Sequence, residues 1–266
     1  MRQIEFRIER TRIAGVVAVH ADSARTFARH SHDQYGIGIL RRGAQASASG
    51  RGPVEAGPGH LITVNPGEVH DGAPIGDGGR AWSMLYLDPE IVAATLADIA
   101  EGAAARSEFT EPALADGRAA ARFERLLAAA TAPGAAPIAA EEALIALLAD
   151  RLAADPRPAR AVPAGIARAR ALADEAFATP LDLADLARAA STSRFALLRG
   201  FVKATGLTPH AYLVQRRVAA ARRAIAAGTA LADAAIAAGF CDQSHMHRHF
   251  VRTLGVTPAA YARACL

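Results

Sequence analysis

One line of sequence occurs twice near the end of this chain. Residues 201–212 read FVKATGLTPHAY and residues 250–261 read FVRTLGVTPAAY, with identical residues at seven places and an offset of 49. Glycine is favoured just past a helix end, and threonine followed by proline is favoured at the start of the next helix. Each copy therefore predicts the end of one helix and the start of another, which constrains this region to a helical fold.

The repeat extends toward the N-terminus of each copy. LADLARAA (183–190) and LADAAIAA (231–238) are both short alanine-rich helices by pattern. STS (191–193) and GFCDQ (239–243) are the turn candidates that follow them. A short helix, a turn and a second helix form the helix-turn-helix layout. The sequence thus predicts two such units, at 183–206 and 231–255, joined by a helix of about five turns over residues 209–228.

In a helix-turn-helix unit, the N-terminal residues of the second helix lie at base edges in the major groove. Arg, Gln, Ser and His can donate hydrogen bonds to bases or phosphates. Phe195 could contact a thymine methyl group or fill the core. The candidate DNA-binding residues are Ser193, Arg194, Phe195, Arg199 and Lys203 in the first unit, and Gln243, Ser244, His247 and Arg248 in the second. Leu197, Phe201, Met246 and Phe250 are expected on the opposite, core-facing side.

Charge is divided unevenly along the chain. Residues 164–266 hold 13 Lys and Arg against 6 Asp and Glu, a net of +7, whereas residues 1–163 hold 17 Arg against 20 Asp and Glu, a net of −3. A basic C-terminal part favours a polyanionic partner such as DNA. A basic domain without such a partner is the alternative on charge alone.

The C-terminal pattern, over about residues 166–266, resembles the DNA-binding domain of the AraC/XylS family of bacterial transcription regulators. Cys241 is a modest departure, because many members have Asp, Ser or Glu just after the Gly-Phe pair. The resemblance implies double-stranded DNA as a partner, and RNA polymerase as another if the protein is an activator. It also implies an N-terminal domain that senses a small-molecule effector and often forms a homodimer.

The first ninety residues predict short strands at 16–21, 35–40, 44–49, 60–65 and 83–88, separated by Gly- and Pro-rich turns. The pattern then changes to three helices, at about 90–100, 115–132 and 138–154. Three prolines in DPRPARAVP exclude a helix or a central strand and mark a linker at 155–163. We therefore expect an α+β chain with a cupin-like barrel over about 1–88, helices over 89–154 and an all-α DNA-binding domain over 164–266.

Two histidine motifs lie among the predicted strands. HSH (30–32) and GHLITVNPGEVH (59–70) resemble the first and second motifs of the cupin barrel. In metal-dependent cupins such histidines bind a metal together with a glutamate, but here Tyr35, Gly36 and Ile37 occupy its place. The sequence favours histidines without a metal and no cofactor. A three-histidine site of His30, His32 and His70 is the alternative.

A small β-barrel can enclose one small ligand. Candidate effector-binding residues are His32, Tyr35, Trp82 and Tyr86, with Arg41 as a partner for an anion. The helix around Leu144, Leu147 and Leu148 is a candidate dimer surface, with internal packing as an equal alternative.

The sequence best fits a ligand-responsive, sequence-specific DNA-binding transcription regulator that is not an enzyme. We expect it in the cytoplasm and not in a membrane, because no signal peptide or membrane-spanning stretch is evident and only two cysteines occur. The alternative is a metal-dependent cupin enzyme with a helical appendage, which uses only the histidines. A third hypothesis is an architectural DNA-binding protein whose barrel only dimerises.

Overall fold

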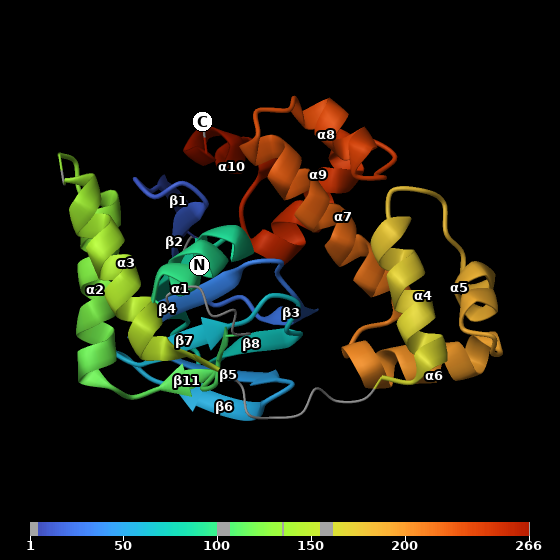
Figure 1. Ribbon diagram of the computed structural model, residues 1–266, viewed down its shortest axis with the longest axis horizontal. Coiled ribbons are helices and arrows are strands. Elements are labelled where there is room, and N and C mark those ends of the chain that lie inside the picture. The colour runs from blue at the N-terminus through green and yellow to red at the C-terminus, as the bar shows by residue number, and fades with distance from the viewer. Residues whose placement is uncertain (1–4, 100–106, 135, 155–161, 266) are drawn as a thin grey trace. The chain divides into compact units, whose positions relative to one another are not determined.

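The computed structural model describes residues 5–99, 107–134, 136–154 and 162–265 (Figure 1). The chain divides into two compact units, Met1–Pro158 and Ala159–Leu266. Most of the predicted linker, residues 155–161, lies outside the described residues.

The N-terminal unit is built on antiparallel sheets. One sheet has the strand order β1-β2-β9-β4-β7-β11, and another has the order β3-β8-β5-β6. A short pair, β10-β12, completes the described strands. The strands are β1 (Glu5–Arg10), β2 (Val16–Ser23), β3 (Phe27–His30), β4 (Tyr35–Arg42), β5 (Ala44–Ser49), β6 (Gly52–Ala56), β7 (Leu61–Val64), β8 (His70–Ile75), β9 (Arg80–Leu87), β10 (Ser107–Phe109), β11 (Ala113–Leu114) and β12 (Leu152–Ala154).

The predicted α+β, cupin-like fold is confirmed, although the described strands form separate sheets rather than one closed barrel. The five strands predicted from the sequence are present as β2, β4, β5, β7 and β9. The sequence did not predict β1, β3, β6 and β8. Their composition explains this: β6 and β8 each contain Gly and Pro, which disfavour strands, and β1 is rich in charge.

Strand β4 separates two apolar clusters. Ile37 and Ile39 join the cluster that contains the helices of this unit, whereas Leu40 joins Trp82 and Met84 in the other. This follows from the strand period of two, which sends neighbouring side chains to opposite faces. Gly38 lies on the second face, where an added Cβ atom would come 2.1 Å from the Met84 Sδ atom. The face toward Trp82 and Met84 is called the inner face below.

Three helices cover the opposite face. They are α1 (Pro89–Ile99), α2 (Gly117–Thr131) and α3 (Pro137–Arg151), and α2 and α3 pack side by side (Figure 1). Leu144, Leu147 and Leu148 are buried in this cluster. Internal packing is therefore the correct alternative for these three leucines, which do not themselves form a dimer surface. The predicted third helix also ends early, because Leu152 begins β12 and pairs with Phe109.

The C-terminal unit is helical throughout its described residues. Its helices are α4 (Ala164–Glu175), α5 (Leu183–Ala189), α6 (Arg194–Thr205), α7 (Pro209–Ala226), α8 (Leu231–Ala237), α9 (Gln243–Leu254) and α10 (Pro258–Cys265). The two predicted helix-turn-helix units are present as α5-α6 and α8-α9. Between them, α7 has 18 residues, a length of about 27 Å at 1.5 Å per residue.

The helix ends follow the local signals that the repeat contains. Gly206 and Gly255 end α6 and α9 in the left-handed conformation, with φ of 78° and 79°. The Thr208 hydroxyl accepts a hydrogen bond from the Ala211 amide at the start of α7, and Thr257 does the same for the Ala260 amide. The repeated line is thus the end of one helix and the cap of the next, as predicted.

Candidate DNA interface and effector site

Helix α6 exposes its N-terminal residues and buries the opposite side. Phe195 is 68% exposed, whereas Leu197 and Phe201 are fully buried against α4 and α5. The Arg199 guanidinium lies over the Phe195 ring, 5.6 Å from its centroid. Phe195 is therefore a surface residue of α6, which leaves its ring free of the core. Ser193, Arg194 and Lys203 are exposed as well.

Helix α9, like α6, has an exposed side and an opposite, buried side. Gln243, Ser244, His247 and Arg248 are exposed, and Met246 and Phe250 are fully buried. Asp242, which the sequence analysis did not single out, caps this helix by accepting a hydrogen bond from the His245 amide at 2.6 Å. An Asp four residues before the first buried position of a helix is a recognisable cap signal. Helices α6 and α9 are called the reading helices below.

Two histidines of α9 belong to its packing. His245 and His249 lie 4.9 Å apart between ring centroids, and both contact the buried Phe240 ring. Burial, followed by the neighbouring Arg252 guanidinium, lowers the pKa of His249 to about 4. The ring is thus neutral near pH 7, and its Nδ1 atom accepts a hydrogen bond from Arg252 at 3.1 Å.

Several arginines of α7 stabilise the domain itself. Arg217 donates hydrogen bonds to the Phe177 and Thr179 carbonyls at 2.7 and 3.3 Å, which fixes the loop between α4 and α5. Arg216 pairs with Asp174 at 3.0 Å, and the buried Arg222 donates to the Tyr261 hydroxyl at 3.2 Å. Part of the basic surplus is therefore structural, and the charge count alone overstates the surface available to DNA.

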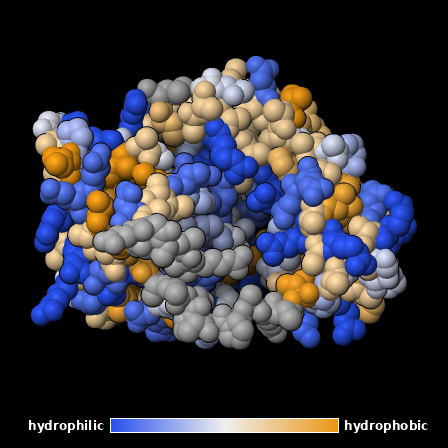
Figure 2. Space-filling model, in the orientation of Figure 1, coloured by the Kyte–Doolittle hydropathy of each residue, from blue (hydrophilic) through white to orange (hydrophobic). Residues whose placement is uncertain are grey.

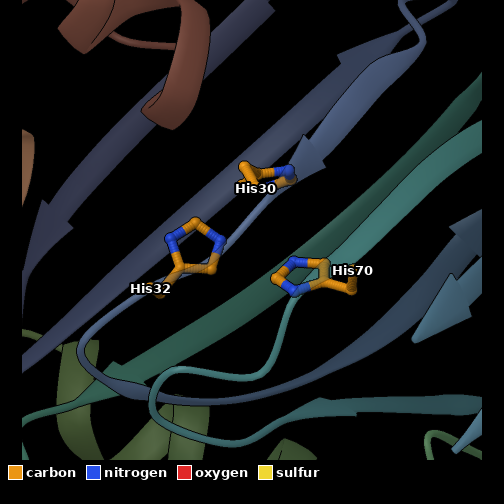
Figure 3. Close-up of side chains that lie close together, drawn as sticks. All are labelled: His30, His32 and His70. Carbon is orange, nitrogen blue, oxygen red and sulfur yellow. The ribbon is translucent and has the colours of Figure 1, made fainter. Parts of the chain in front are cut away.

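In the N-terminal unit, strands β3 and β8 bring three histidines together (Figure 3). His30 pairs with His70 across β3 and β8, and His32 follows β3. Ring centroids are 4.8 Å apart for His30 and His32, 4.4 Å for His30 and His70, and 5.1 Å for His32 and His70. One ring nitrogen from each lies within 4.8 Å of the others.

Burial, followed by the neighbouring His70, lowers the pKa of His30 to about 4. Burial also lowers the pKa of His70. Both rings are therefore neutral near pH 7. Tyr86 lies beside His32, with 5.3 Å between ring centroids, and burial raises the pKa of its phenol to about 12. The neutral imidazoles of His30 and His70 and a protonated phenol therefore lie close together.

The five candidate effector residues separate onto two faces of the sheet. Trp82 and Tyr86 belong to the inner face, and His32 contacts Tyr86 there. Tyr35 instead packs with the helix-side cluster against Phe109, and Arg41 forms an ion pair with Glu124 of α2. Tyr35 and Arg41 therefore do not lie on the same side of the sheet as the other three, because their odd positions in β4 point toward the helices.

A buried cation on the inner face was not predicted from the sequence. Arg80 is 1% exposed and its guanidinium lies 4.8 Å from the Trp82 ring centroid. It donates hydrogen bonds to the Gln45 side chain at 2.7 Å and to the Arg25 and Gly72 carbonyls at 3.1 and 3.3 Å. Burial lowers its pKa to about 10. No local sequence signal distinguishes Arg80 from an ordinary turn arginine.

An open groove of about 700 Å³ lies along β3, β8, β5 and β6. Alanines line much of it, and Arg29, Glu55 and Asp71 are its charged residues. None of the five candidate effector residues lines this groove. The groove and the histidine cluster are thus two distinct places on this sheet.

Comparisons with known proteins agree with both halves of the fold. The family described as an AraC-like ligand binding domain matches residues 14–148, about half of the chain, and a helix-turn-helix domain family matches residues 186–264. The chain belongs to the AraC family of transcription regulators. It is a DNA-binding regulator with an N-terminal ligand-binding domain, as the two helix-turn-helix units and the resemblance to the AraC/XylS family predicted.

Individual relatives are similar at different lengths. An HTH-type transcriptional regulator of Bacillus subtilis, YbfI, is 27% identical over 225 residues, which is 83% of this chain and 81% of that protein. The regulatory protein Ada of Salmonella typhimurium is 39% identical over 85 residues, 32% of this chain and 24% of Ada. ToxT of Vibrio cholerae has a similar fold, with a TM-score of 0.57 at 12% identity over 97% of this chain and 100% of ToxT.

The length and hydropathy of the helices bear on whether this chain can span a membrane. In the described part of the chain, no helix is long and apolar enough to cross a membrane. On the face drawn in Figure 2, the most hydrophobic residues occur in small separate groups among hydrophilic ones.

Proposed function

We propose that α6 and α9 read two neighbouring stretches of one DNA site in successive major grooves. Such grooves are about 34 Å apart on one side of the duplex, and α7, about 27 Å long, lies between the two units in the chain. The observation that carries the proposal is that α6 and α9 bury apolar side chains at equivalent positions but expose different side chains.

In the first unit, Phe195 and Arg199 act together. An exposed phenylalanine suits contact with a thymine methyl group, and an arginine suits the O6 and N7 atoms of guanine. Stacking of the guanidinium over the Phe195 ring restricts both side chains before DNA binds. Ser193, Arg194 and Lys203 contribute contacts to phosphates, because all three are exposed on the same helix or its cap.

In the second unit, Gln243 and Arg248 carry the base contacts, and Ser244 and His247 assist them. Glutamine suits adenine and arginine suits guanine, so the two units prefer different bases. We therefore expect a DNA site with two adjacent halves of different base sequence.

We further propose that the effector binds on the inner face of the N-terminal unit, between His32, Trp82 and Tyr86. The protein acts in the cytoplasm as a regulator and not as an enzyme, with RNA polymerase as a partner where it activates transcription. A homodimer would form through a surface other than the buried leucines of α3. Sedimentation with and without DNA tests this state, and a monomer on DNA would contradict it.

Binding to a labelled duplex of the gene's own upstream region tests the DNA-reading proposal. Arg199→Ala and Arg248→Ala should each weaken binding by about 5- to 100-fold, because one base contact is worth about 1–3 kcal/mol. Arg118→Ala is the control, because it removes the same charge from an exposed position in the N-terminal unit. Unchanged affinity in both reading-helix variants, or binding retained without residues 164–266, would contradict the proposal.

A further inference from the structure

The three histidines of the N-terminal unit are arranged as ligands. His30 comes from β3, His32 from the segment after it and His70 from the start of β8, so residues 40 positions apart converge (Figure 3). Their ligand atoms lie within 4.8 Å of one another.

Hydrogen bonds fix which nitrogen two of these rings present. The His30 Nδ1 atom lies 2.8 Å from the Ala28 carbonyl oxygen, and the His70 Nδ1 atom lies 3.0 Å from the Glu68 carbonyl oxygen. A carbonyl oxygen can only accept, so Nδ1 carries the proton in both rings. The lone pair of each neutral ring is then on Nε2. Backbone carbonyls orient metal-bound histidines in this way.

We propose that His30, His32 and His70 bind one divalent first-row transition metal ion, through Nε2 of His30 and His70 and one ring nitrogen of His32. Three imidazoles favour Zn²⁺, Ni²⁺ or Co²⁺ over Mg²⁺ or Ca²⁺, which prefer oxygen ligands. A fourth coordination position would be left for water or for a donor atom of the effector.

The distances require a modest closure. Metal–nitrogen bonds of about 2.0–2.1 Å in tetrahedral geometry place the ligand nitrogens about 3.3 Å apart. The three histidines therefore approach one another by up to roughly 1.5 Å on binding, starting from the 4.8 Å limit. His32 is half-buried and outside the strands, so rotation of its side chain can supply most of that movement.

The site deepens the proposed ligand-sensing role but does not depend on DNA recognition. The sequence argued against a metal because the usual glutamate is replaced by Tyr35, Gly36 and Ile37. Tyr35 packs against Phe109 on the helix side and Ile37 is buried in the helix-side cluster. The oriented nitrogens make a three-imidazole site without that carboxylate.

Calorimetric titration of the untagged, chelator-treated full chain with Zn²⁺, Ni²⁺ and Co²⁺ separately tests the proposal. One equivalent of at least one ion should bind, and His32→Gln and His70→Gln should each weaken binding by at least about 10- to 100-fold, which is the usual effect of losing only a hydrogen-bond partner of a ligand. Because His32 is half-buried outside the strands, its loss leaves the sheets intact, and a circular dichroism spectrum checks this. Bound Co²⁺ should also give the intense visible absorption of a four-coordinate ion, which His32→Gln abolishes.

The control is the double variant His245→Gln/His249→Gln, which removes a pair of neighbouring histidines from the C-terminal unit. It should bind the metal as the wild type does. Unchanged affinity in His32→Gln and His70→Gln would overturn the proposal, whatever the control variant shows. So would less than about one third of an equivalent bound by the wild type. Neither result affects the DNA-binding proposal, which the Arg199 and Arg248 variants test independently.

Discussion

The turn of the second helix-turn-helix unit has no space for a side chain at Gly239. Its φ is +81°, and an added Cβ atom would lie 2.6 Å from the Ala178 Cα atom and 2.7 Å from the Ala178 carbonyl oxygen. These contacts are with backbone, so rotation of a side chain cannot relieve them. The same loop is held by Arg217 through the Phe177 and Thr179 carbonyls, which keeps it in place beside the turn.

Gly239→Ala should therefore destabilise the C-terminal unit through two effects. A left-handed conformation costs a residue with a Cβ atom about 1–2 kcal/mol. Overpacking against a fixed neighbour costs about 1–3 kcal/mol more. The sum, roughly 2–5 kcal/mol, corresponds to a fall in melting temperature of about 10–25 °C for a unit of this size.

Differential scanning calorimetry of the full chain measures this fall in the C-terminal transition. Gly134→Ala is the control for backbone conformation and is measured in the transition of the N-terminal unit, because Gly134 also has a positive φ, +79°, but has no atom within 4 Å of the added Cβ. It should cost only the conformational part, about 1–2 kcal/mol. If Gly239→Ala lowers the melting temperature no more than the control does, the close contact between turn and loop is refuted.

Three further outcomes follow from the C-terminal unit. Asp174→Ala should lower the free energy of unfolding by about 1–3 kcal/mol in a denaturant titration, because it leaves the Tyr212 hydroxyl without its acceptor at 2.7 Å, and should not change DNA sequence preference. Between pH 6.5 and 4, His249 is protonated in the unfolded chain but not in the folded chain. Acidification over this range should therefore lower the melting temperature. In His249→Gln the melting temperature should depend less on pH. Asp242→Ala, measured by thermal unfolding, should cost about 1 kcal/mol through loss of the α9 cap, and an unchanged melting temperature would contradict this role.

Local signals made the C-terminal unit predictable. Ser193 caps α6, and Gly206 and the Thr208-Pro209 pair act within a few residues of their own positions, so sequence alone indicates their structure. The buried side of each reading helix was also predictable, because helical period separates Leu197 and Phe201 from Arg199.

The N-terminal unit depends on pairing between distant strands, which a local pattern does not specify. The pairing of β3 with β8 places His30 opposite His70, yet neither strand was predicted. Strand β4 is buried on both faces, so its alternation could not reveal that Tyr35 and Arg41 face the helices while Leu40 faces Trp82. The packing of helices α1, α2 and α3 determines which face of β4 lies toward them. That packing is set by the tertiary structure and not by the local sequence of β4.

Selection of bound sequences from a random DNA pool tests the central claim most directly. The wild type should select two groups of preferred bases about 10–10.5 base pairs apart. Arg199→Ala should relax preference in one group only, and Arg248→Ala should relax it in the other group only. If both variants relax the same positions, or if neither changes the selected sequence, α6 and α9 do not read separate halves of one site.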